Sequence, residues 1–275
     1  MEKGLYPSHL DDPIRIELAV SYLKHEFRKL LWRVPENHWP VIDKDISAWM
    51  ESPQLNTPRD FWNGFHGIAM GFKLKIGLIY FVTAENIIWK KETIPLEKLT
   101  FGIEFPPTQA VKSGILSVKE VAQFYHNPKN IKIKEKQKKI TEAFSQGTLP
   151  RDEDPIIVTE KMVEEKEVLS VYEGNGRLVK AILEEKERLP AFVGRFTTKE
   201  KKPRNYWMPT SVLMEILYFA RDAFEKEDKV LFQAHLKVLK NMLAKSESAV
   251  YELKNRALTN KQPFRSEVLK LLNLV

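Results

Sequence analysis

The sequence predicts an α+β protein with a central domain of strands and helices between two mainly helical regions. Short apolar, β-branched runs at 155–158 and 168–172 have the length and composition of buried strands, and the acidic turn between them predicts a hairpin. After a glycine-containing turn, apolar residues at helical spacing over 178–183 predict a helix, and 189–193 predicts a third strand. The expected domains are residues 1–92, 93–200 and 201–275.

The composition is that of an ordinary folded protein. Of the 275 residues, 43% are hydrophobic and 29% are charged, which excludes an intrinsically disordered chain. The absence of cysteine excludes disulfides, thiolate metal sites and cysteine nucleophiles, and it favours a cytoplasmic location. The most apolar window, residues 68–82, contains two lysines and is shorter than the roughly 20 residues that a bilayer requires, so no membrane partner is expected.

The net charge of +7 favours anionic partners. Residues 1–95 contain twelve basic and twelve acidic side chains, so the excess lies in the rest of the chain. The densest segment, 127–139, has one glutamate and six lysines: Lys129, Lys132, Lys134, Lys136, Lys138 and Lys139. Such a segment is either a solvated helix face or a surface for the backbone of a nucleic acid, with DNA as the expected polymer.

The N-terminal region predicts helices followed by a β-hairpin. Pro13 after two aspartates and the sequence Thr57-Pro58 are typical helix starts. Residues 72–82 then follow a β-like pattern that a turn would join to a second strand at 87–89, although a helix continuing from Phe61 is the alternative. The tryptophans of this region have apolar neighbours, which favours a place in the core over base stacking.

The sequence Glu-Gly-Asn-Gly-Arg at 173–177 is the strongest candidate for a functional site. The first turn of a helix has unpaired N–H groups and the positive end of the helix dipole, so it attracts phosphate. Gly174 and Gly176 allow a ligand to approach the backbone closely, and Arg177 can contact two phosphate oxygens. Glu173 is placed to accept a proton, orient a hydroxyl or bind a metal. Alternatively, the glycines only form a tight turn and Arg177 forms a local salt bridge.

Four consecutive pieces of this stretch resemble the ParB/sulfiredoxin superfamily, also described as the ParB-like nuclease domain. They are the strand at 170–173, the Gly-x-x-Arg turn at 174–177, the alanine-containing helix at 180–183 and the strand at 189–193. Upstream, a helix at 136–147 and an opening segment at 94–99 extend the resemblance to about residues 93–197. The resemblance implies a ParB/sulfiredoxin-like fold for the central domain.

The resemblance also implies a nucleotide or phosphate site at the Gly-x-x-Arg turn. Segregation ParB proteins bind CTP there and clamp DNA, archaeal free serine kinases use ADP there, and sulfiredoxins use a cysteine that this chain lacks. Asn175 and Gly176 replace the two histidines of the kinase turn, and Gly176 and Val179 replace arginines of the ParB turn. The identity of the base therefore stays open between these uses.

The C-terminal region predicts a bundle of helices. One helix starts near Thr210, a long one is expected at about 228–257, and a last one starts at Pro263. No helix-turn-helix pattern follows the central domain, which argues against operator binding by the usual route. A bundle that packs on the central domain or forms a homodimer is expected.

These observations lead to the hypothesis of a nucleotide-binding, DNA-associated protein. Backbone amides of Gly174, Asn175 and Gly176 would hold the phosphates of CTP, ADP or ATP, with or without Mg²⁺. Arg177 would neutralise their charge, and Lys180 would assist one turn later. One alternative is an enzyme, a nucleotide hydrolase, a nuclease or a small-molecule kinase with Glu173 as general base. Another is a non-enzymatic interaction protein.

The sequence contains no motif of a resident metal site. It has no Walker-type loop and no His-Glu-x-x-His helix. The three acids at 152–154 are a conceivable divalent-ion site, but adjacent acids in a turn are usually only solvated. We therefore predict no metal ligands from the sequence.

Overall fold

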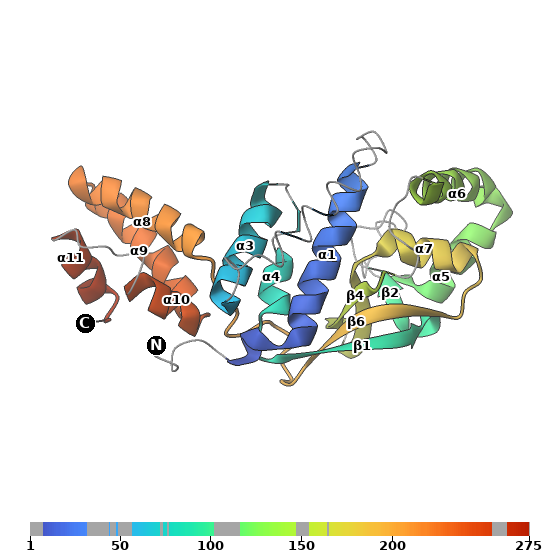
Figure 1. Ribbon diagram of the computed structural model, residues 1–275, viewed down its shortest axis with the longest axis horizontal. Coiled ribbons are helices and arrows are strands. Elements are labelled where there is room, and N and C mark those ends of the chain that lie inside the picture. Colours follow the sequence, from blue (N-terminus) through green and yellow to red (C-terminus); the bar gives the residue numbers. More distant parts are fainter. Residues whose placement is uncertain are drawn as a thin grey trace. The chain divides into compact units, whose positions relative to one another are not determined.

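The chain forms an α+β structure whose residues divide into two units (Figure 1). The computed structural model describes residues 8–31, 44, 48, 57–71, 74–75, 77–101, 116–146, 154–163, 165–254 and 263–274. The first, here called the helical unit, comprises the described residues of Met1–Asp12, Ser52–Asn86 and Pro203–Val275. The second, the sheet unit, comprises those of Pro13–Glu51 and Ile87–Lys202.

The sheet unit is built on a six-stranded mixed sheet in the order β1-β6-β4-β5-β2-β3. Antiparallel pairs are β1 with β6, β4 with β5 and β2 with β3, whereas β6 runs parallel to β4 and β2 parallel to β5. The strands are β1 (Ile87–Pro95), β2 (Leu99–Phe101), β3 (Leu116–Ser117), β4 (Ile156–Val163), β5 (Lys166–Glu173) and β6 (Arg188–Phe196).

The centre of this sheet matches the elements predicted from the sequence. Strands β4 and β5 form the expected hairpin, with Glu165 in the left-handed conformation at the turn (φ 65°). Helix α7 (Asn175–Leu183) follows β5 and leads to β6, which pairs on the far side of β4. The connection from β5 to β6 therefore crosses over β4, and the glycine turn lies at the end of β5 where this crossing begins.

Among its described residues, the sheet unit also contains the helices α1 (Pro13–Leu31), α5 (Val118–His126) and α6 (Ile131–Gln146). Helix α5 begins with a capping box, because Ser117 accepts from the Glu120 N–H while the Glu120 carboxylate accepts from the Ser117 N–H. Helix α1 packs against β1, and Arg15 donates to the carbonyl oxygen of Ile87. Short 3₁₀ turns complete the unit at Leu96–Lys98 and Pro128–Asn130.

The sheet is buried on both faces at its centre. Val171, Ala191 and Val193 belong to one core with the apolar sides of α5 and α7. Side chains on the other face of the sheet, such as Phe192, are also buried. The Trp89 ring lies over Gly194, with which Trp89 pairs between β1 and β6. Burial on both faces explains why β4 and β6 carry continuous apolar runs instead of alternating ones.

The helical unit contains the helices α3 (Pro58–Gly71), α4 (Gly77–Val82), α8 (Thr210–Glu225), α9 (Lys229–Leu243), α10 (Glu247–Glu252) and α11 (Phe264–Leu271), and the 3₁₀ turn Ser8–Asp11. Its largest buried side chains include Trp62 and Trp207, which confirms a core role for Trp62. Glu252 is fully buried, forms a two-pronged ion pair with Arg59 and accepts a hydrogen bond from Thr210. This pair links residues 193 positions apart in the sequence.

The β-hairpin predicted for residues 72–89 is wrong. Gly77–Val82 forms helix α4, in which Leu78, Ile79 and Val82 are buried at helical spacing. The predicted second strand is the first part of β1, and its partner is β6, about a hundred residues later in the chain. A short apolar run has no period that separates helix from strand, so its tertiary partner decides.

The long helix predicted for about 228–257 is also divided in the structure. Helix α9 ends at Leu243, and Ser246 caps the separate helix α10 by accepting from the Ala249 N–H. Serine is a preferred N-cap residue, so Ser246 marks the start of a second helix, which the continuous apolar spacing did not reveal.

The three consecutive domains expected at 1–92, 93–200 and 201–275 differ from the two units observed, because α1 and β1 belong with the sheet. None of the described helices is both long and apolar enough to cross a membrane.

We predict that Glu252→Ala strongly destabilises the helical unit. The substitution removes the buried partner of Arg59, and breaking such a pair typically costs about 3 kcal/mol. Urea denaturation of the variant would measure this loss. As a matched control, Glu225→Ala removes the exposed pair with Arg221 and should cost less than about 0.5 kcal/mol. Equal losses in the two variants would contradict the structure.

Candidate functional site

The turn between β5 and α7 depends on glycine at position 174. Gly174 has φ 104° and ψ 20°, a left-handed conformation, and caps α7 without any side-chain hydrogen bond. A Cβ at this position would lie 2.6 Å from Cγ2 of Ile156, which is closer than atoms can approach. The backbone conformation and the packing therefore both require glycine here.

Gly176 is different, because the fold gives no reason for glycine at this position. It lies in the first turn of α7 and is exposed, and a Cβ added to it would meet no described atom within 4 Å apart from its chain neighbours and its own helix backbone. Glycine inside a helix costs up to about 1 kcal/mol relative to alanine. The open space in front of this residue is where a ligand could reach the backbone amides of the first turn.

Arg177 is half-buried in the first turn of α7 and bonds to the two residues just before β4. Its Nη1 donates to the carbonyl oxygens of Asp154 (2.6 Å) and Pro155 (3.0 Å). Burial lowers the pKa of the guanidinium, and the nearby carboxylates of Glu173, Asp154 and Glu26 act in the opposite direction. An arginine keeps its charge in such surroundings, so the first turn of α7 carries a fixed positive charge.

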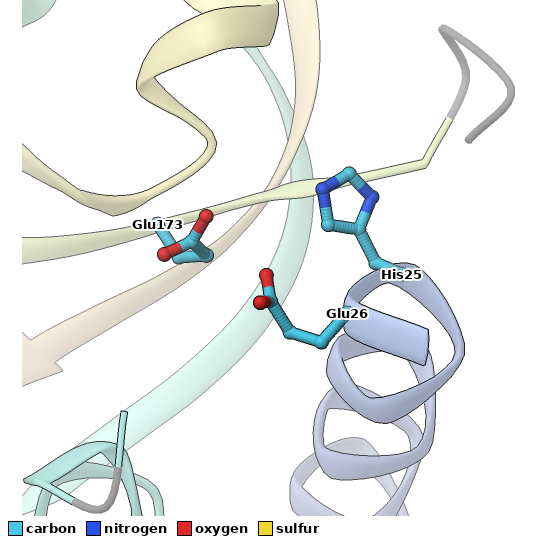
Figure 2. Close-up of side chains that lie close together, drawn as sticks. All are labelled: His25, Glu26 and Glu173. Atoms are coloured by element: carbon cyan, nitrogen blue, oxygen red, sulfur yellow. The ribbon is translucent and has the colours of Figure 1, made fainter. Parts of the chain in front are cut away.

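Glu173, at the end of β5, faces two side chains from helix α1 (Figure 2). One donor atom each of His25, Glu26 and Glu173 lies within 4.8 Å of the other two. His25 and Glu173 are only 4% and 8% exposed, and Glu26 is half-buried. The Nδ1 atom of His25 also lies 3.5 Å from a carboxylate oxygen of Asp154. Glu173 therefore belongs to a buried group of ionisable side chains.

The remaining predicted residues lie around the same turn. The side-chain oxygen Oδ1 of Asn175 is buried and has no hydrogen-bond partner among the described residues. Lys180 lies one turn further along α7, and its Nζ is 3.7 Å from the carboxylate of Glu184. Of the acids at 152–154, Asp154 lies at this site and the other two fall outside the described residues.

The six lysines form a basic surface on and just before helix α6, which packs beside α7 (Figure 1). Five of them are exposed and Lys134 is half-buried. Ile131 and Ile133 are exposed between them, at 54% and 51%. We call this the α6 surface; it comprises Lys129, Lys132, Lys134, Lys136, Lys138 and Lys139.

The sequence did not predict His25 and Glu26 as site residues, because they lie about 150 positions before Glu173. One signal was present: His25 follows Leu18 by seven residues and Tyr22 by three, so it lies on the apolar side of its helix. A histidine on that side is buried when the helix packs.

Comparison with protein-family models, with curated proteins and with solved structures finds no match.

The two glycines of the turn should respond oppositely to alanine. Gly174→Ala should cost at least about 2 kcal/mol, because it combines an unfavourable φ with a clash against Ile156. Gly176→Ala should leave stability unchanged or raise it by up to about 1 kcal/mol. Thermal and urea unfolding of both variants would test the difference. Similar destabilisation by both would show that position 176 is closely packed.

Proposed function

We propose that the chain is a ParB/sulfiredoxin-like protein that binds a nucleotide through its phosphates at the start of α7 and associates with nucleic acid. The observation that carries the proposal is the exposed, unobstructed Gly176 in the first turn of a helix whose N-cap has no side-chain hydrogen bond. Backbone amides at such a position attract phosphate oxygens, and their dipole favours negative charge. The fold does not require glycine at position 176, so its presence there favours a ligand that occupies the space a side chain would fill.

The arrangement around the turn supports the resemblance to this superfamily. The pieces that carry it occupy a strand, a tight turn, a helix and a second strand, in that order. Arg177 contributes in a different way from a direct two-pronged phosphate contact. With Nη1 bonded to two carbonyl oxygens, its charge favours an anion over the helix start while its hydrogen bonds hold β4 in place.

The α6 surface is the proposed contact for nucleic acid. Five exposed lysines on and before one helix can lie along a phosphate backbone and contact it without reading bases. Helix α6 packs against α7, so a polymer on this surface would lie close to the nucleotide site.

A second candidate is phosphoryl transfer to a small molecule, with Glu173 as general base. The observation in its favour is the buried position of Glu173 beside Glu26 and His25, where a carboxylate is held away from water. This activity would use the same phosphate site. The two proposals differ in one respect that can be measured. Only the second requires transfer of a phosphoryl group to an acceptor, and therefore turnover that depends on Glu173.

Nucleotide affinity should fall at least tenfold in Gly176→Ala. The new Cβ occupies the space in which the phosphates would approach the amides, whereas the fold tolerates it. Calorimetric titration with ATP, ADP, CTP and GTP, with and without Mg²⁺, measures the change and shows which base is preferred. Gly67→Ala is the matched control, because Gly67 is also helical, exposed and free of neighbours within 4 Å. Unchanged affinity in Gly176→Ala, or no binding by the unmodified protein, would refute the proposal.

Neutralising the α6 surface should weaken DNA binding and reduce its dependence on salt. Replacing Lys132, Lys136 and Lys139 with glutamine should lower the slope of log K against log salt by about 2 to 3, since each lost phosphate contact removes about 0.9. Fluorescence anisotropy with a duplex of arbitrary sequence measures the slope. The control replaces three exposed lysines of α9 with glutamine: Lys229, Lys237 and Lys240. Equal effects of the two triple variants would mean that only net charge matters.

A further inference from the structure

We infer that His25, Glu26 and Glu173 bind a divalent cation. Their donor atoms lie within 4.8 Å of one another, so small side-chain rotations bring all three to one ion (Figure 2). Two of the ligands come from neighbouring positions near the C-terminal end of α1 and the third from the end of β5. Both elements belong to the sheet unit, which makes the site part of one compact body.

The burial of these groups favours a metal site over a solvated surface cluster. His25 and Glu173 are 96% and 92% buried by their exposed fractions of 4% and 8%. Placing two carboxylates and an imidazole together away from water is costly unless a positive charge compensates the carboxylates. Arg177 supplies part of that charge, because its guanidinium interacts with the carboxylates of Glu173 and Glu26. A divalent ion would add further positive charge at the point where the three donors converge.

The surroundings of His25 resemble the outer shell of many metal sites. A carboxylate oxygen of Asp154 lies 3.5 Å from Nδ1 of His25, which is an ion-pair contact and longer than a typical N–H···O hydrogen bond. In many metal sites a carboxylate next to a ligating histidine orients the ring. With Nδ1 near Asp154, Nε2 is the nitrogen that would bind the ion.

Asn175 gives an independent indication that a cation or a hydrogen-bond donor binds near this turn. This residue follows Glu173 by two positions, and its Oδ1 is buried and receives no hydrogen bond from any of the residues that the structure describes. Buried amide oxygens are almost always paired, and a cation or a metal-bound water would satisfy this one.

The donor set indicates the class of metal. One imidazole nitrogen with two carboxylates suits Mn²⁺, Co²⁺ or Zn²⁺, whereas Mg²⁺ and Ca²⁺ prefer oxygen ligands alone. Three protein ligands leave coordination positions open, as in catalytic metal sites. If the phosphate proposal also holds, an ion here could polarise a phosphoryl oxygen at the neighbouring turn. The metal site itself rests on the three side chains and does not require that proposal.

The test is calorimetric titration of the full chain, first stripped with a chelator, with MnCl₂, ZnCl₂ and MgCl₂ in the absence of nucleotide. We expect one site per chain for Mn²⁺ or Zn²⁺ and weaker binding of Mg²⁺. His25→Ala, Glu26→Gln and Glu173→Gln should each lower the affinity at least tenfold. The matched controls His126→Ala and Glu97→Gln alter exposed side chains of the same unit and should bind as the unmodified protein does.

Thermal unfolding with and without metal separates a lost site from a lost fold. Metal should raise the melting temperature of the unmodified protein and not that of Glu26→Gln, whose half-buried side chain can be replaced without disrupting the core. Gly176→Ala should keep its metal affinity, so failure of the phosphate proposal would leave this result intact. Absence of Mn²⁺ and Zn²⁺ binding, or undiminished binding in all three ligand variants, would overturn the inference.

Discussion

The arrangement of the sheet unit depends on the turn at Gly174. The chain leaves β5 and crosses over β4 only because this residue adopts a positive φ and has no Cβ to collide with Ile156. The same turn sets the direction of α7, whose Arg177 bonds to the carbonyl oxygens of the two residues just before β4. It also ends β5 at Glu173, next to α1. One backbone constraint therefore positions the helix terminus, the buried positive charge and the carboxylate together.

Two kinds of buried polar group can be distinguished in this protein. Glu252 is paired with Arg59 and Thr210 inside the helical unit, and this closed network accounts for its burial. The group at His25, Glu26 and Glu173 instead brings an imidazole and two carboxylates within 4.8 Å of one another, near the guanidinium of Arg177. Paired charges serve the fold, whereas metal-ligating groups that converge on one point can share a bound cation. This contrast is the reason why we propose a site in the sheet unit.

The chemistry proposed for this site combines features that suit one class of ligand. Helix amides and a buried arginine attract an anion, while two carboxylates and a histidine attract a cation. A nucleotide phosphate with its metal ion presents both charges over a few ångströms. The α6 surface adds positive charge on the adjacent helix, so a polyanion could approach without competing for the same donors.

The sequence by itself determined the elements with strong local signals. The β4–β5 hairpin, the glycine turn, α7 and β6 follow from β-branched runs, paired glycines and helical spacing, and the helix starts at Pro13 and Pro58 follow from their capping residues. These signals are local because backbone conformation and capping act over a few residues. The α+β class followed from the same elements.

Only the tertiary structure decided the long-range pairings. Gly77–Val82 became a helix and Ile87 began a strand because of what each packs against, and a short apolar run carries no record of its partner. Likewise, His25 and Glu26 meet Glu173 because α1 packs in the sheet unit, and nothing near Glu173 in the sequence encodes that contact. A site assembled from distant segments is determined by packing, which depends on the whole chain at once.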